Sequence, residues 1–128
     1  MIEKKNITDG IIFEENESSP NKIVFNFRSW VNIIIGLVIK YTDKSKQEAE
    51  DLVFQSPIIC GALNNYMSVA LRSHETEYHW VMTIVYGERY WDKNISVEEP
   101  QDYFEWESEY RLKNNLAKES FEFFDGFE

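Results

Sequence analysis

Cysteine, glycine and cationic residues are scarce in this chain of 128 residues, and each scarcity excludes a class of protein. The single cysteine, Cys60, excludes an internal disulfide framework and a zinc site built from cysteines alone. Only five glycines are present, and the sequence contains neither a phosphate-binding glycine-rich motif nor the G-x-S-x-G motif of a nucleophilic serine. With 13 Lys and Arg against 23 Asp and Glu, the net charge is −10. Direct binding to nucleic acid is therefore disfavoured, because phosphates need cationic partners.

Long apolar runs are also missing. The most apolar stretch, Val31 to Ile39, is much shorter than the roughly 20 residues that a membrane-spanning helix needs. The first ten residues are polar and lack the apolar segment of a secretory signal. Three Asn-x-Ser/Thr sequons, at Asn6, Asn16 and Asn94, therefore carry no weight. We expect a cytoplasmic protein that does not bind a membrane.

The chain nevertheless contains enough apolar material for a packed core, since 43% of its residues are hydrophobic and 16% are aromatic. Its length fits one domain, 1–128, better than two. Residues 1–22 are predicted to form a weakly structured leader with a short strand at 11–13 and a loop at 14–21. An extended run at 23–27 follows.

Local signals predict five helices. The first is apolar on nearly every face, which is typical of a central helix. Ser45 and Glu48 fit a capping box for the second, and Ser56 with Pro57 marks the start of the third. The predicted helices span 29–41, 46–54, 57–71, 76–86 and 100–116.

Two segments remain open. In 78–86 an alternation of large apolar residues competes with helical periodicity, so an α+β fold with a strand there is the alternative. The tail, 121–128, fits either a last helical turn or a docked extension. The fold class favoured by the sequence is mainly α, a compact single-domain helical bundle with a short extended or strand segment near the N-terminus.

Candidate catalytic and metal-binding residues do not form a recognisable set. His74 and His79 are five residues apart, about 140° around a helix, whereas the H-E-x-x-H zinc motif places its histidines about 40° apart. Cys60 lies in an apolar helix start, where a buried, unreactive cysteine is the commonest case. The paired carboxylates have no histidine or basic companion that would define an acid–base site. We therefore expect no enzyme activity, no metal and no cofactor.

Negative charge is concentrated near the carboxyl end. Residues 98–128 contain ten acids and three bases, a net charge of −7, whereas residues 1–97 carry −3. Aromatic residues are interleaved with these acids, a mixture that combines interface anchors with electrostatic steering. A solvated acidic face is the plain alternative. The predicted partner-binding residues are Glu98, Glu99, Asp102, Glu105, Trp106, Glu109 and Tyr110.

Two stretches within residues 45–92 resemble the sequences of a known class of proteins. The sequences QEAEDLVFQSPI at 47–58 and YHWVMTIVYGERYW at 78–91 resemble small bacterial immunity proteins of contact-dependent growth inhibition and related polymorphic toxin systems. The resemblance implies a cytoplasmic antitoxin that binds a cognate C-terminal toxin domain and blocks its active site or its access to a partner. Many such toxins resemble nucleases with basic clefts. No catalytic residue is carried over, because these proteins act by binding.

We consider three hypotheses for the function, in order of preference. The first is a toxin inhibitor that works by protein–protein interaction with a basic nuclease domain. The second is a small acidic helical adaptor or structural protein without a toxin partner. The third is a small enzyme that uses Cys60 or the two histidines. A homo-oligomer is compatible with the first two functions.

Overall fold

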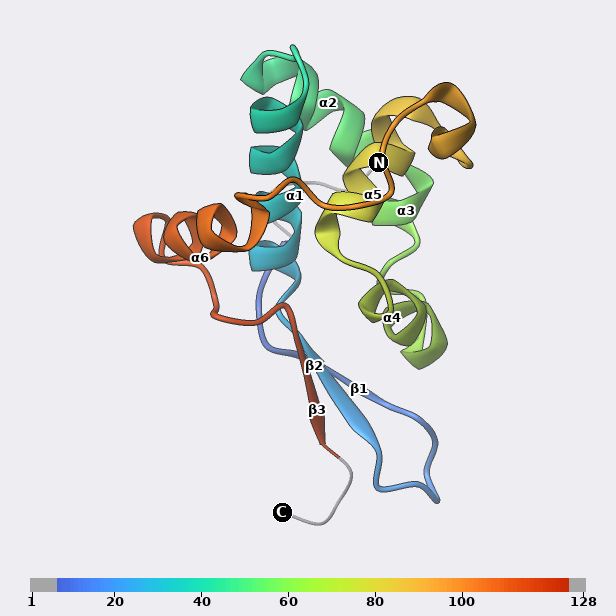
Figure 1. The fold of residues 1–128 in the computed structure, drawn as a ribbon. Coiled ribbons are helices and arrows are strands. Elements are labelled where there is room, and N and C mark those ends of the chain that lie inside the picture. Colours follow the sequence, from blue (N-terminus) through green and yellow to red (C-terminus); the bar gives the residue numbers. More distant parts are fainter. Residues whose placement is uncertain (1–6, 125–128) are drawn as a thin grey trace.

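A computed structural model describes residues 7–124, which are mainly helical with a small three-stranded antiparallel sheet. Most of the helices gather around one central helix, whereas the helix at 66–73 contacts the sheet, which extends at one end of the molecule (Figure 1). None of the helices in this range combines the length and apolar content required to cross a bilayer. In chain order the elements are β1 (Ile11–Glu14), β2 (Lys22–Phe25), α1 (Phe27–Tyr41), α2 (Lys46–Gln55), α3 (Pro57–Cys60), α4 (Tyr66–Ser73), α5 (Glu77–Tyr86), the 3₁₀ helix η2 (Tyr90–Lys93), α6 (Tyr103–Lys113) and β3 (Phe121–Phe124).

Helix α1 is the centre of the core, as its apolar sequence predicts. Trp30, Ile33, Ile34 and Leu37 are fully buried, and helices α2, α5 and α6 all contact α1. The helix begins at Phe27, two residues before the predicted start. Its early start is stabilised by the leader, because Asp9 accepts a hydrogen bond from the Ser29 backbone N–H at 2.8 Å. The leader thus supplies the cap that the local sequence lacks.

Helices α2 and α5 form where the sequence predicts them. The capping box of α2 is present: Ser45 Oγ accepts from the Glu48 N–H at 3.1 Å, and Glu48 accepts from the Ser45 N–H at 2.9 Å. Thr76 caps α5, which ends before Gly87, a residue with φ of +94°. Segment 78–86 is therefore helical, and the strand alternative is wrong.

The predicted helix over 57–71 is wrong as one continuous element. Helix α3 ends at Cys60, and α4 begins only at Tyr66. The reason is local: the Asn65 side chain accepts from the Ser68 N–H at 2.8 Å and so starts a new helix. The last predicted helix, 100–116, is also shorter than expected, since α6 spans Tyr103–Lys113.

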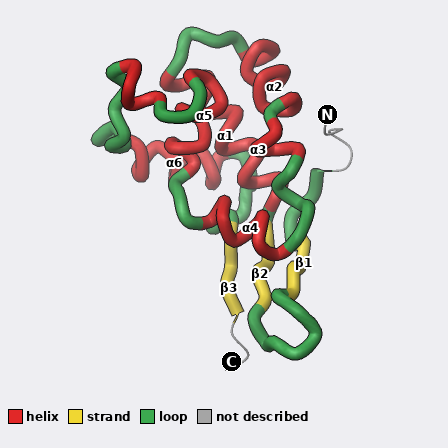
Figure 2. The backbone as a smooth tube through the Cα atoms, turned by 90° about the vertical axis from the view of Figure 1, so that its right-hand side faces the viewer, coloured by secondary structure: helices red, strands yellow, loops and turns green. Residues whose placement is uncertain are grey.

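The sheet has the order β1-β2-β3, and both ends of the described chain contribute to it (Figure 2). The strand predicted at 11–13 is confirmed as β1, which pairs with β2, so the described part of the leader is more ordered than expected. Residues 121–124 of the tail form a strand rather than a helical turn. Phe121 pairs with Phe25, and their rings stack at 4.7 Å. Residues 1–6 of the leader and 125–128 of the tail lie outside the described residues.

Candidate functional site

The inner side of helix α6 lies against the middle of α1. The rings of Trp106 and Tyr110 stack on each other with centroids 4.7 Å apart. Both reach Gly36, where an added Cβ would lie 2.7 Å from Tyr110 Cζ and 3.1 Å from Trp106 Cη2. A glycine is therefore needed at this contact. Two of the predicted partner-binding residues, half-buried in the chain, hold α6 in place.

A third predicted partner-binding residue, Asp102, makes polar contacts within the chain. Its carboxylate lies 3.0 Å from Lys40 Nζ and accepts a hydrogen bond from the Tyr41 hydroxyl at 2.8 Å. The hydrogen bonds from Tyr41 and Lys40 hold the pKa of Asp102 below its usual value. Asp102 thus fastens the start of α6 to the end of α1, and its charge is largely balanced by Lys40.

Glu98 and Glu99 precede α6 and have different surroundings. Glu99 is half-buried and accepts a hydrogen bond from the Thr76 hydroxyl at 3.0 Å, beside the start of α5. Glu98 is exposed, and its backbone N–H donates to the Ser96 hydroxyl at 3.0 Å. Of this pair, Glu98 is the more exposed residue.

The outer face of α6 consists of five exposed residues: Phe104, Glu105, Ser108, Glu109 and Leu112. At about 100° per residue they fall within one arc of roughly 140°, opposite the side that packs on α1. Phe104 is 60% exposed and Leu112 is 81% exposed. Within the described residues, the Glu105 and Glu109 carboxylates have no hydrogen bond or ion pair. Two large apolar side chains and two free negative charges therefore share one exposed helix surface.

A hollow of about 480 Å³ adjoins the outer face of α6. Phe104 and Leu112 border it, together with Leu116 and Lys118. Neither Phe104 nor Leu112 is among the partner-binding residues predicted from the sequence. The signal that identifies them is their i, i+8 spacing with Ser108 between, on the arc opposite Trp106 and Tyr110.

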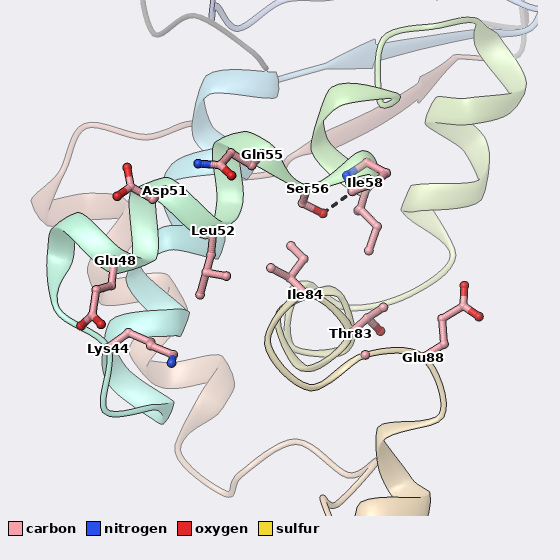
Figure 3. Close-up of a pocket in the computed structure, with 12 residues that line it drawn as sticks. Lys44, Glu48, Asp51, Leu52, Gln55, Ser56, Ile58, Thr83, Ile84 and Glu88 are labelled. Atoms are coloured by element: carbon pink, nitrogen blue, oxygen red, sulfur yellow. Dashed lines mark hydrogen bonds between the residues drawn. The ribbon is translucent and has the colours of Figure 1, made fainter.

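A second, larger hollow lies elsewhere in the fold, between helices α2 and α5. This α2–α5 groove has a volume of about 720 Å³, and its apolar residues include Leu52, Ile58 and Ile84. In Figure 3 the side chains of Leu52 and Ile84 extend into the same space from opposite walls. Sequence reasoning did not predict this groove, because its walls are brought together only by the packing of two helices.

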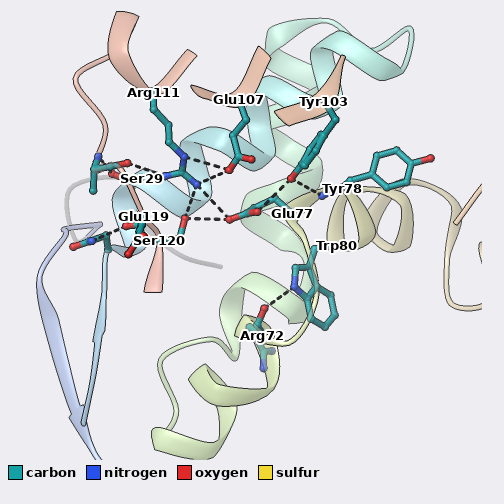
Figure 4. Close-up of polar contacts among 12 residues, drawn as sticks. Ser29, Arg72, Glu77, Tyr78, Trp80, Tyr103, Glu107, Arg111, Glu119 and Ser120 are labelled. Atoms are coloured by element: carbon teal, nitrogen blue, oxygen red, sulfur yellow. Dashed lines mark hydrogen bonds and ion pairs between the residues drawn. The ribbon is translucent and has the colours of Figure 1, made fainter. Parts of the chain in front are cut away.

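Beneath α6, a buried polar cluster ties three parts of the chain together (Figure 4). The Arg111 guanidinium lies 2.7 Å from Glu107 of the same helix and 3.4 Å from Glu77 at the start of α5. Arg111 also donates to Ser120 Oγ at 2.9 Å and to the Ala117 carbonyl at 2.8 Å, just before β3. The cluster fixes α6 relative to α5 and to the chain that leads into the sheet.

The same cluster changes the acidity of one carboxyl group. Burial raises the pKa of Glu77, and the nearby Glu107 carboxylate raises it further. The hydrogen bond from Ser120 and the charge of Arg111 act in the opposite direction but do not outweigh burial. The Tyr103 hydroxyl lies 3.3 Å from Glu77 Oε2 and completes the surroundings of this carboxyl.

The candidate catalytic residues are placed apart from one another. His79 Nδ1 lies 3.0 Å from the Tyr90 hydroxyl in a ring of aromatic contacts, whereas His74 is exposed after α4. Cys60 is half-buried, with its sulfur 3.4 Å from the Phe54 carbonyl oxygen. Across residues 7–124, no group of three or more His, Cys, Asp or Glu side chains is arranged to hold a metal ion.

Comparisons of the chain with models of known protein families, with curated proteins and with solved structures find no match.

Proposed function

We propose that this chain is an immunity protein that binds a cognate C-terminal toxin domain, a basic nuclease, through the outer face of α6. Binding occludes the active site of the toxin or the surface that it needs for a partner, and it takes place in the cytoplasm. The observation that carries the proposal is the outer face itself, where the exposed Phe104 and Leu112 lie beside the unpaired Glu105 and Glu109.

The two kinds of side chain have different roles in this proposal. Phe104 and Leu112 lose water on binding and provide the apolar anchors, at roughly 25 cal/mol per Å² of buried surface. Glu105 and Glu109 attract a cationic surface over distances of about a Debye length, near 10 Å at 0.1 M salt. Charge at the edge of an interface mainly raises the association rate, whereas buried apolar anchors slow dissociation.

The inner side of α6 supports this role by keeping the outer face in one position. Trp106 and Tyr110 hold the helix on α1, and Arg111 joins it to Glu77 and to the segment before β3. An interface that is already ordered loses less conformational entropy on binding. Four of the residues predicted from sequence to contact the partner, Glu99, Asp102, Trp106 and Tyr110, therefore contribute mainly by positioning α6.

The charge of the chain agrees with a basic partner. Residues 98–128 carry a net charge of −7, and a nuclease cleft that binds phosphates is cationic. An acidic helix face with apolar anchors can occupy such a cleft in place of nucleic acid. The resemblance of 47–58 and 78–91 to bacterial immunity proteins supports the same function.

The test is binding to the protein encoded immediately upstream, measured with purified toxin domain. Glu105→Lys combined with Glu109→Lys should lower the association rate constant at least about tenfold at low salt, because steering charges are reversed. Leu112→Ala should instead raise the dissociation rate constant. Both variants should also release the toxin activity that the unmodified protein inhibits.

A matched control reverses the same amount of charge elsewhere. Glu17→Lys combined with Asp43→Lys changes two exposed acids outside the proposed interface and should leave both rate constants within about twofold. Equal effects of the two charge reversals would show that only net charge matters. Tight binding that none of the α6 substitutions alters would place the interface elsewhere, and absence of toxin binding would favour the adaptor.

A further inference from the structure

The α2–α5 groove has an apolar interior that the rest of the described chain leaves open. Leu52 on α2 and Ile84 on α5 face each other across it, and Ile58 of α3 lies at one end (Figure 3). Leu52, Ile58 and Ile84 are each half-buried rather than covered. An apolar side chain that enters the groove would therefore displace water from three aliphatic surfaces.

The rim of the groove is acidic. Glu48, Asp51 and Glu88 line it and are exposed, whereas Lys44 is the single cation among the described lining residues. The capping hydrogen bonds with Ser45 hold the pKa of Glu48 below its usual value, so that carboxylate is ionised at neutral pH.

The other two rim acids are also available to a ligand. Asp51 accepts one hydrogen bond, from the Gln47 side chain at 2.9 Å. Glu88 has no hydrogen bond or ion pair with the chain between residues 7 and 124. The nearby Lys93 does not line the groove, and its ammonium donates to the Tyr86 carbonyl. The rim thus complements positive charge placed a few ångströms from an apolar group.

The polar groups of the groove distinguish a protein segment from a small molecule. Small-molecule sites orient their ligand with a few buried, convergent polar groups. Here the carboxylates stand on the exposed rim, and the buried Ser56 hydroxyl is used by its own helix, accepting from the Ile58 N–H at 3.2 Å. A groove with an apolar floor and a charged rim fits the side chains of a segment of another protein.

We propose that the α2–α5 groove is a docking site for a short segment of a protein partner in which Lys or Arg alternates with apolar residues. The apolar side chains occupy the space between Leu52 and Ile84, and the cations meet Asp51 and Glu88. This site is separate from the outer face of α6 and does not depend on the function proposed for that face.

The test uses three short acetylated and amidated peptides of equal length, composed of Lys with Leu, Lys with Gln, and Glu with Leu. Each is titrated into isotopically labelled protein while backbone amide chemical shifts are recorded. The Lys–Leu peptide should shift the amides of Leu52, Ile84 and Gly87 in a saturable manner. The Lys–Gln and Glu–Leu peptides should bind at least about tenfold more weakly, because the first lacks apolar side chains and the second lacks positive charge.

Two pairs of substitutions make the outcome specific. Asp51→Lys with Glu88→Lys should weaken binding of the Lys–Leu peptide about tenfold. Glu105→Lys with Glu109→Lys should leave the affinity for this peptide within about twofold. Leu52→Gln reports on the apolar floor without changing charge and should also weaken binding; the unliganded amide spectrum of each variant shows that the fold is kept. Non-saturating shifts spread over all acidic surfaces, or equal weakening by the α6 pair, would overturn the proposal.

Discussion

Gly36 shows how one residue sets the position of the candidate binding helix. A glycine inside a helix costs roughly 0.5–1 kcal/mol relative to alanine. Here the missing Cβ leaves room for the rings of Trp106 and Tyr110, which lie where that atom would project. The close contact between α1 and α6 therefore offsets the loss of intrinsic helix stability at Gly36.

Gly36→Ala should lower the free energy of unfolding by about 1–2 kcal/mol, because overpacking at Tyr110 outweighs the gain in helix propensity. In a Tyr110→Ala background the 2.7 Å clash is removed and only the 3.1 Å approach to Trp106 remains, so the same substitution should be clearly less destabilising. Urea denaturation of the four proteins in this cycle measures both values. A stabilising effect of Gly36→Ala in the presence of Tyr110 would contradict the packing described.

Glu77 provides a second prediction at the residue scale, on the dependence of stability on pH. Its pKa in the folded chain is raised above the ordinary value of 4.5, so the folded state retains a proton that the unfolded state releases. Stability contributed by the protonated carboxyl is therefore lost as the pH rises through the window that begins near 4.5. Glu77→Gln removes this loss while keeping a side chain of the same shape.

The free energy of unfolding of Glu77→Gln, relative to the unmodified protein, should therefore increase as the pH is raised from about 4.5 towards neutrality. Denaturation measured over that range at fixed ionic strength gives the difference at each pH. Glu17→Gln, which removes one carboxyl at an exposed loop position, is the matched control. A flat profile for Glu77→Gln would show that burial does not perturb the Glu77 carboxyl.

At the scale of elements, what the sequence predicts depends on how local each signal is. Helices α1, α2 and α5 carry their own capping residues, apolar patterns or stop signals, and all three were predictable. The break between α3 and α4 also has a local signal in Asn65, but apolar residues on both sides of it favoured one helix. Strand β3 depends on a distant contact, because Phe121 is paired with Phe25, which is far away in the sequence.

Helix α6 shows why the candidate site was predictable only in part. The location of the negative charge is visible in the sequence, but aromatic or aliphatic residues occur on both sides of the helix. The packing of Trp106 and Tyr110 against Gly36 decides which side faces inward. Phe104 and Leu112 become the exposed pair only as a consequence of that contact.

The capping of α1 by the leader gives a prediction at this scale. Asp9 accepts from the Ser29 N–H and hydroxyl, each at 2.8 Å, and Thr8 O accepts from the Arg28 N–H at 3.0 Å. Asp9→Ala should therefore destabilise the protein by about 1–2 kcal/mol, the usual effect of removing a helix cap. Asp9→Asn, which keeps one acceptor oxygen, should destabilise the protein less than Asp9→Ala does. Thermal unfolding of both variants tests this order, and equal stabilities would argue against the cap.

At the scale of the whole molecule, the two ends of the described chain meet at the start of the central helix. The Asn26 side chain accepts from the Gly10 N–H at 3.0 Å and donates to the Glu119 carbonyl at 2.8 Å. The Arg111 cluster adds a link from α6 to Ser120 on the way to β3. These ties fix the position of α6 and leave its outer face to solvent, which the proposed binding to a basic protein requires.

The most direct test of that account is site-specific photocrosslinking to the toxin domain. Ser108, exposed at the centre of the outer face of α6, is replaced by benzoylphenylalanine, and Glu17 is replaced in a control protein. Irradiation of the complexes should link the toxin through position 108 and not through position 17. A complex that forms with unchanged affinity, yet crosslinks through position 17 and not through position 108, would contradict the claim that α6 is the binding surface.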